Sequence, residues 1–439
     1  MVPLALLVAS SPAAAQSLDE ALATAYQTNP NLSAAEASLR RTDEGVSQAL
    51  AGWRPSADLS VGGGYAADLA GTSSGSQQST LSSSEGAVVS FDFRVRQPIY
   101  NFITPATVEQ AKSNVKAERA RLTATEQDVL LHATTAYLDV LRNQAILEET
   151  TRQQQQLERD LATAQHRFQL GELRNSDVAQ SEASVARARS QRTVAEGNLA
   201  TARAAYVQVI GRPPETLTLP PEPQGLPASQ EEAVARSADA PAVIAANYAR
   251  ARAASDGIDI SNGQQLPQFA IQGDAGAANQ SILAVMTVPL ARGGALDAQV
   301  RASKQLQMQR EQEREAQLRQ AQQEAVQAWQ SYQSAKSNVD SSKAQLKSAQ
   351  IAADGIRREA SLGLRTVTDV LIAQQQVLDA DVSLITAQRD TLLGAYQLLA
   401  ADGGLTAQGL GLDVPYYNPK VHYDQARTQL WGRDVDQGK

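Results

Sequence analysis

The stretch that decides the fold reads Val89-Ser90-Phe91-Asp92-Phe93-Arg94-Val95-Arg96. Apolar and polar side chains alternate along it, which indicates a β-strand with one apolar face and one wetted face. The same period of two occurs upstream, where one set of alternate residues is mostly apolar and the other is small or polar: Leu59, Val61, Gly63, Tyr65, Ala67 and Leu69 against Ser60, Gly62, Gly64, Ala66 and Asp68. The two runs predict an amphipathic hairpin over about residues 56–97.

A second hairpin is predicted over about residues 267–290. Its first strand begins with Phe269 and Ile271 on one face and Gln272 and Asp274 on the other. The return strand, residues 282–288, is apolar on both faces and is less informative. The chain therefore supplies four predicted strands. Alternation is clear in both strands of the first hairpin, and in the second hairpin it is clear only at the start of the first strand.

The second hairpin belongs to an internal duplication, with landmarks that recur at a nearly fixed offset. The paired landmarks are Pro55 and Pro267, Pro98 and Pro289, Gly171 and Gly363, Asp177 and Asp369, and Gly211 and Gly403. We therefore predict a first repeat over 16–211, a proline-rich linker over 212–230, a second repeat over 231–403 and an irregular tail over 404–439. Each repeat is expected to contain a helix, a hairpin, a very long helix and a shorter helix.

The long helices are expected at about 103–166 and 294–360, and the shorter ones at about 176–210 and 366–400. Each long helix would have about 65 residues, or about 100 Å at 1.5 Å per residue. Residues repeat every seven positions along the first of them: Val108, Val115, Leu122, Val129 and Ala136. Sustained heptads indicate coiled-coil packing, and the many alanines allow helices to approach closely.

Four strands cannot close a β-barrel, for which about eight is the practical minimum. Unpaired strand edges are not tolerated in lipid. We therefore expect an obligate oligomer whose hairpins share one barrel in a membrane, with the flanking helices continuing its wall into the adjacent aqueous space. Because one strand face is polar, such a tube would be a water-filled conduit.

Composition limits the other possibilities. The chain has 439 residues, a net charge of -8, three histidines and no cysteine. These values argue against disulfides, a His-based metal centre, a cofactor and nucleic-acid binding. No nucleophile elbow or phosphate loop is visible, so an enzyme is not expected. A structural coiled-coil surface protein anchored by a barrel remains an alternative, although it is expected to have one C-terminal barrel segment, whereas the hairpins here are internal and duplicated.

The N-terminus predicts export. Residues 1–15 combine a short apolar run with a small-residue site before Gln16, which is typical of a signal peptide. Its basic n-region is missing, so we expect the signal to be truncated. No later stretch has about 18 consecutive apolar residues, the length of a spanning helix.

The duplicated helix–hairpin–helix pattern resembles the TolC family of outer-membrane channel proteins over nearly the whole mature chain. The segments 168–178 and 362–371 are similar to the family's helix-turn motifs, and residues 417–432 are similar to the tail of members that serve type I secretion. The resemblance implies an α+β homotrimer with a twelve-stranded barrel in the outer membrane and an α-helical barrel in the periplasm. It also implies docking to a periplasmic adaptor and, through it, to an inner-membrane ABC transporter or a proton-driven RND transporter.

The two turns between long and short helices hold the candidate site residues. Gly171 and Gly363 are expected to end the long helices and to lie in the adaptor-docking motifs. The resemblance implies that Asp369 forms an acidic ring at the periplasmic aperture. It likewise implies that Arg365, with Ser176 and Asp177 as partners, latches neighbouring coils. Exposed pairs contribute only about 0–1 kcal/mol each, so the latch would need several copies and partial burial.

Two family features are absent. Ile372 stands where a second ring aspartate is often found, and Ala360 stands where the family has an aromatic latch residue. We therefore expect one acidic ring and a weaker latch. The tail favours type I secretion of proteins as the function, and small-molecule efflux is the alternative.

Overall fold

The structure is a computed structural model that describes residues 16–66, 86–276, 280–290, 292–430 and 432. The expected signal peptide and the predicted strand residues Ala67, Asp68 and Leu69 lie outside these ranges. The chain divides into two compact units. The first comprises residues 1–38, 119–245 and 315–418, and the second comprises 39–118, 246–314 and 419–439.

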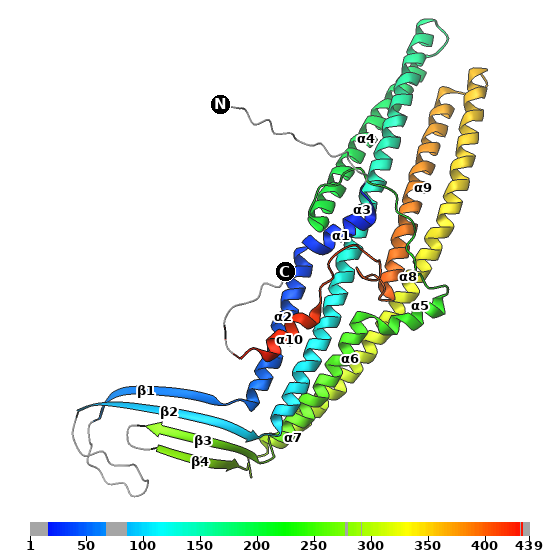
Figure 1. Cartoon of the computed structure of the whole chain (residues 1–439). Coiled ribbons are helices and arrows are strands. Elements are labelled where there is room, and N and C mark those ends of the chain that lie inside the picture. Colours follow the sequence, from blue (N-terminus) through cyan, green and yellow to red (C-terminus); the bar gives the residue numbers. More distant parts are fainter. Residues whose placement is uncertain (1–15, 67–85, 277–279, 291, 431, 433–439) are drawn as a thin grey trace, which may run out of the picture. The chain divides into compact units, whose positions relative to one another are not determined.

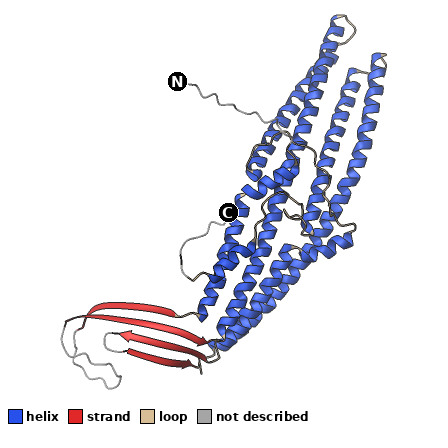
Figure 2. Ribbon diagram, viewed as in Figure 1, coloured by secondary structure: helices blue, strands red, loops and turns tan. Residues whose placement is uncertain are grey.

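Unit 1 is helical (Figures 1 and 2). It contains α1 (Leu18–Thr28), α4 (Asn175–Ile210), α5 (Gln230–Arg236), a 3-10 turn at Ser237–Asp239 and α9 (Val367–Ala401). Four further helices run through both units: α2 (Pro30–Leu50), α3 (Ile103–Gln169), α6 (Pro241–Ala254) and α8 (Ala295–Ser361). The sequence predicts 103–166 for α3 and 294–360 for α8, so the helices begin and end within a few residues of the expected positions. No helix among the described residues is both long enough and apolar enough to cross a bilayer.

Local chemistry sets several helix ends. At the start of α1, the Ser17 hydroxyl accepts a hydrogen bond from the Glu20 amide at 3.2 Å, and the Glu20 carboxylate accepts one from the Ser17 amide at 3.3 Å. This reciprocal pair is a capping box. Helix α4 ends at Gly211, whose φ of 85° is a left-handed conformation that glycine adopts without strain. Helices α2 and α6 begin with Pro30 and Pro241, at the position where proline fits a helix best.

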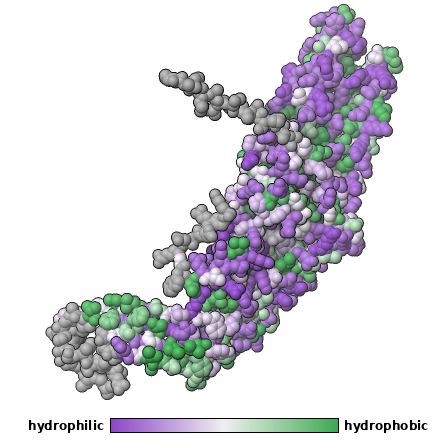
Figure 3. All heavy atoms as spheres, in the orientation of Figure 1, coloured by the Kyte–Doolittle hydropathy of each residue, from purple (hydrophilic) through white to green (hydrophobic). Residues whose placement is uncertain are grey.

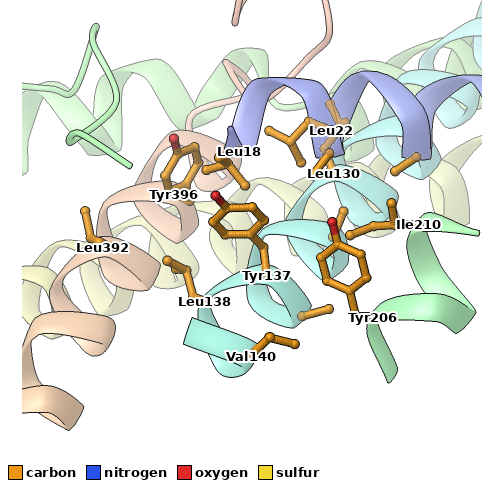
Figure 4. Packing of buried hydrophobic residues seen from close by; sticks show 14 of the residues in the cluster. Leu18, Leu22, Leu130, Tyr137, Leu138, Val140, Tyr206, Ile210, Leu392 and Tyr396 are labelled. Atoms are coloured by element: carbon orange, nitrogen blue, oxygen red, sulfur yellow. The ribbon is translucent and has the colours of Figure 1, made fainter. Parts of the chain in front are cut away.

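The core of unit 1 is a cluster that we call the hub (Figure 4). It gathers buried side chains from α1, α3, α4, α9 and the segment that follows α9, among them Leu22, Leu130, Tyr137, Tyr206, Tyr396, Leu405 and Leu412. Burial raises the pKa of both Tyr206 and Tyr396 to about 12. Because its residues come from five segments, the hub packs together parts of the chain that lie far apart in the sequence.

The proline-rich linker is attached to the hub through two tyrosines. Gln16 and Leu217 form a short parallel bridge, in which the Gln16 amide donates to the Thr216 carbonyl at 2.8 Å. The Tyr137 hydroxyl lies 2.7 Å from the Thr218 carbonyl and accepts a hydrogen bond from the Thr218 amide at 3.1 Å. The Tyr206 hydroxyl donates to the Gln16 side-chain oxygen at 2.9 Å. The linker is thus packed on the helices where it begins.

Unit 2 contains the sheet. Its strands are β1 (Ser56–Ala66), β2 (Gly86–Tyr100), β3 (Gln268–Gly276) and β4 (Gln280–Thr287), antiparallel in the order β1-β2-β3-β4. Short turns at Ala51–Trp53, Ser255–Ile260 and α7 (Ser261–Gly263) connect it to helices. The β2–β3 pairing joins the two hairpins into one sheet and shifts register between Pro98 and Tyr100.

The two faces of the sheet differ as the alternation predicts. On one face, large apolar side chains are left uncovered, including Val61 at 70% exposure and Ile282 at 83%. Figure 3 shows apolar residues gathered on the visible side of the strands. The opposite face of β1, β2 and β3 carries Asp58, Asp92, Arg94, Arg96 and Asp274. On β4, Leu283 and Val285 fall on this second face, which is why its sequence lacks alternation.

The expectation of an irregular tail over 404–439 is wrong for Pro419–Thr428, which form a helix, whereas residues 404–418 contain turns but neither helix nor strand. Leu405, Ala407, Leu412 and Val414 are buried in the hub. The Ala407 amide donates to the Glu126 carboxylate at 2.7 Å, and burial raises the pKa of that carboxyl. In unit 2, Pro419–Thr428 form helix α10. The His422 Nδ1 atom lies 3.1 Å from a carboxylate oxygen of the fully buried Asp43 on α2.

Candidate functional site

The first candidate turn connects α3 to α4. Gly171 has a φ of 79°, its amide donates to the Phe168 carbonyl at 2.9 Å, and the Glu172 amide reaches back to the Arg167 carbonyl at 2.9 Å. This is the backbone pattern that ends a helix at a left-handed glycine. The side chains of Arg167 and Glu172 also form an ion pair of 3.0 Å across the turn. Asp177 then accepts a hydrogen bond from the Arg174 amide at 3.2 Å as α4 begins.

The second turn, between α8 and α9, repeats this backbone. Gly363 has a φ of 75°, and the Leu364 amide donates to the Glu359 carbonyl at 3.0 Å. At the start of α9, the Asp369 amide donates to the Thr366 hydroxyl oxygen at 3.2 Å, while the Asp369 carboxylate accepts from the Thr366 amide at 2.9 Å. The amide and hydroxyl of Thr366 lower the pKa of the Asp369 carboxyl. Asp369 is therefore anionic and held at the start of the helix.

The two turns carry an ion pair at the same place with its charges exchanged. Arg167 and Glu359 each lie four residues before the turn glycine. Arg167 pairs forward with Glu172, whereas Glu359 pairs forward with Arg365, with 2.7 Å between its carboxylate and Arg365 Nε. The second turn thus places its cation on the loop and the first places its anion there.

Arg365 does not contact its expected partners within this chain. Its guanidinium pairs with Glu359, Ser176 is exposed, and the Asp177 carboxylate caps its own helix. Ile372 is 53% exposed on α9. The latch predicted between Arg365 and the pair Ser176 and Asp177 is therefore a hypothesis about neighbouring copies of the chain.

Several apolar side chains lie exposed at the turns. Leu170 is 63% exposed, Leu362 is 75% exposed and Leu364 is 73% exposed. Leu362 and Leu364 flank Gly363, so both of these exposed leucines belong to the second turn. In the part of the chain that the structure describes, no cluster of His, Cys, Asp and Glu is arranged to hold a metal ion.

A contact that the sequence did not predict joins the helix pairs behind the turns. The side-chain amide of Gln374 on α9 donates to the Asp160 carboxylate on α3 at 2.8 Å, and Gln374 is only 5% exposed. Leu157, Val185, Ala188 and Leu371 pack beside it. Farther along, the Arg389 guanidinium lies 2.9 Å from the Asp139 carboxylate. Because these partners are more than 200 residues apart, no local pattern could have revealed them.

Comparison with known proteins decides the family. The model of the outer membrane efflux protein family matches residues 21–212. The outer membrane efflux protein BepC of Brucella suis biovar 1 is 30% identical over 441 residues, which cover 97% of this chain and 94% of BepC. The chain is a member of the outer membrane efflux protein family.

Two further relatives agree with the family. The outer membrane protein TolC of Vibrio cholerae is 23% identical over 442 residues, covering 94% of this chain and 96% of that protein. The Campylobacter jejuni CmeC outer membrane channel has the same fold, with a TM-score of 0.78, 14% identity and coverage of 94% of this chain and 89% of that one. The predicted resemblance to TolC-type channels is confirmed, and this efflux protein family member belongs to the outer membrane and is not an enzyme.

Proposed function

We propose that three copies of this efflux protein family member pool their sheets into one twelve-stranded β-barrel and act as the outer-membrane exit duct of an export system. The observation that carries the proposal is the sheet in unit 2. Its apolar face is uncovered, its opposite face is charged, and β1 and β4 each pair on one side only within the described residues. Free edges and an uncovered apolar face are unfavourable in a lone chain and favourable in a shared barrel in lipid.

The helices would continue the barrel into the periplasm as an α-helical tube. The turns around Gly171 and Gly363 would be its far end, where the exposed leucines offer an apolar surface to a periplasmic adaptor. Through that adaptor the duct would connect to an inner-membrane ABC or RND transporter. Three copies of Asp369 would form an acidic ring that attracts cations and repels anions.

The two faces of β1 provide a direct test of the barrel. Val61 lies on the apolar face at 70% exposure, and its neighbour Ser60 lies on the charged face. A charged residue on the lipid face of a barrel costs about 2–4 kcal/mol at the bilayer midplane. We expect Val61→Arg to abolish insertion and the heat-labile trimer on gels, and Ser60→Arg, the matched control, to preserve both. Equal insertion of the two variants would contradict the proposed barrel.

For the cargo, we propose type I secretion of proteins, on the resemblance of residues 417–432 to the tails of such members. Part of this segment is helix α10, which contacts α2 through His422. The alternative is small-molecule efflux, and the family and BepC both carry the word efflux in their names. Deletion of the gene separates them. Loss of a protein from the culture medium with unchanged dye accumulation supports secretion, and dye accumulation with an unchanged secreted proteome supports efflux.

A further inference from the structure

A row of charged side chains crosses the sheet on the face opposite the apolar one. The pairing register places Asp58 on β1 opposite Arg94 on β2, Arg94 opposite Asp274 on β3, and Asp274 opposite Ser281 on β4. Directly opposed residues of antiparallel strands point to the same face. The row therefore runs across all four strands at one level of the sheet, and we call it the charged row.

The centre of the charged row is a hydrogen-bonded network that joins the two hairpins. Arg94 Nε donates to a carboxylate oxygen of Asp274 at 2.8 Å, and an Arg94 terminal nitrogen donates to Asp92 at 3.2 Å. The Gln272 amide also donates to Asp274, at 3.1 Å. Because its partners hold Arg94 in place, its charge is fixed relative to the strands rather than free on a flexible side chain.

These side chains are in contact with water. Arg94 has 51% of its side chain exposed, Asp92 has 49% and Asp274 has 26%. Charged groups of this kind cannot face lipid, so in a barrel they face the lumen. The charged face of β1, β2 and β3 holds three carboxylates, Asp58, Asp92 and Asp274, and two guanidinium groups, Arg94 and Arg96, within the described residues. That face has a net negative charge.

We propose that the charged row is an ion-selectivity element inside the barrel, distinct from the aperture at the helix turns, with Arg94 as the residue that limits its preference for cations. This inference rests on the proposed trimeric barrel. Three copies would form a charged band around the lumen, in which each Arg94 offsets one of the surrounding carboxylates. Fixed charges act on passing ions over about one Debye length, about 10 Å at 0.1 M salt.

The test is the ratio of cation to anion permeability, taken from reversal potentials of purified trimers in planar bilayers under a KCl gradient. All variants carry Asp369→Asn as background, so that the aperture does not dominate. Arg94→Gln is expected to raise the ratio about twofold at about 0.1 M salt, and Asp274→Asn is expected to lower it by a similar factor. Both shifts should shrink near 1 M salt, where the Debye length is about 3 Å.

Two controls separate charge from structure. Arg94→Lys retains the positive charge and should leave the ratio unchanged. Lys112→Gln removes a positive charge from α3, where Lys112 pairs with Glu109, and should also leave it unchanged. If Arg94→Gln fails to assemble, the other two variants still test the proposal, because Asp274→Asn should lower the permeability ratio and Arg94→Lys should leave it unchanged. Shifts in the same direction for Arg94→Gln and Asp274→Asn, or no shift in either, would overturn the charged row. Absence of current from every protein, including the unaltered one, would instead overturn the barrel.

Discussion

The hub and the two helix turns lie in the same unit and are built in opposite ways. In the hub, Tyr137 bonds to Thr218 across 81 residues, and Tyr206 bonds to Gln16 across 190. At the turns, Asp369 bonds to Thr366 and Arg365 bonds to Glu359, so contacts span only three to six residues. The hub is buried, whereas Leu362 and Leu364 at the second turn are about three-quarters exposed.

Because of this difference, we expect that substitutions can alter stability and the proposed gating separately. Long-range buried contacts hold the segments of unit 1 together, so changes there should unfold it. Contacts confined to a turn leave the rest of the chain unaffected when they are lost. If the turns form the proposed aperture, their residues can therefore change partners between a closed and an open state at small cost to the fold.

The largest effect should come from the hub. Leu130 is fully buried, so Leu130→Ala should lower the free energy of unfolding by about 3 kcal/mol through lost burial and a residual cavity. Leu364→Ala removes the same atoms from a side chain that is 73% exposed and should change it by less than about 0.5 kcal/mol. Denaturant titration of the purified protein measures both. Equal losses would erase the distinction between hub and turn.

The next effect concerns the linker. Tyr137→Phe leaves the Thr218 amide without the hydroxyl that it donates to, which should cost about 1–2 kcal/mol. Limited proteolysis within residues 212–230 should accelerate accordingly. Tyr416 is a control, because it is 48% exposed and its hydroxyl donates to the Leu412 carbonyl, four residues away. Faster cleavage in Tyr416→Phe than in Tyr137→Phe would show that the hub does not hold the linker.

At the turns, replacing either glycine by alanine should lower stability by similar amounts, smaller than those expected for the hub and the linker. A Cβ atom at Gly171 or Gly363 would meet nothing within 4 Å, so only backbone strain at positive φ opposes alanine. Each Gly→Ala change should destabilise by about 1 kcal/mol. Gly197, in the middle of α4, also has open space and no positive φ, so Gly197→Ala should be neutral or stabilising. Thermal melts of the three variants compare them, and a loss at Gly197 as large as at the turns would contradict the strain argument.

Changes to the proposed latch should alter conductance more than stability. We expect Arg365→Ser and Asp177→Ala each to raise single-channel conductance in planar bilayers, because both would remove an attraction between neighbouring coils. Arg167→Ser is the matched control, since it breaks the Arg167–Glu172 ion pair at the other turn. Unchanged conductance in both latch variants would remove the latch from the account.

Asp369→Ala should relieve block by trivalent cations and lower the melting temperature slightly, because it also removes the carboxylate that caps α9. The pKa of Asp369 is lowered by its bonds from Thr366. The carboxylate therefore stays charged at pH values where an ordinary aspartate begins to take up a proton. Block and the capping contribution to stability should both persist as pH falls and disappear only below the lowered pKa. Block that is retained in Asp369→Ala at the same cation concentration would exclude this ring.

Sequence patterns predicted those features that depend on residues close together in the chain. Alternation in residues 89–96 indicated an amphipathic strand, and the glycines at 171 and 363 indicated helix ends that the structure places at positive φ. The β2–β3 pairing, the Gln374–Asp160 contact and the packing of the tail on the hub depend on residues far apart in sequence. The latch role of Arg365 is implied by family resemblance, and because its guanidinium bonds to Glu359 in the structure, a latch to a neighbouring copy stays a prediction.

The central claim, that identical chains pool their sheets, is tested most directly by cross-linking the two edge strands. The chain has no cysteine, so disulfides can form only where cysteines are introduced. Ser60 on β1 and Ser281 on β4 share the charged face but lie at opposite edges of the sheet. A cysteine at Ser60 would be combined in turn with one at Ser281, Leu283 or Val285, with each single cysteine as control. Oxidation in membranes should give covalent trimers on denaturing gels for at least one pair. Only monomers from every pair, in protein that has inserted into the membrane, would contradict the account.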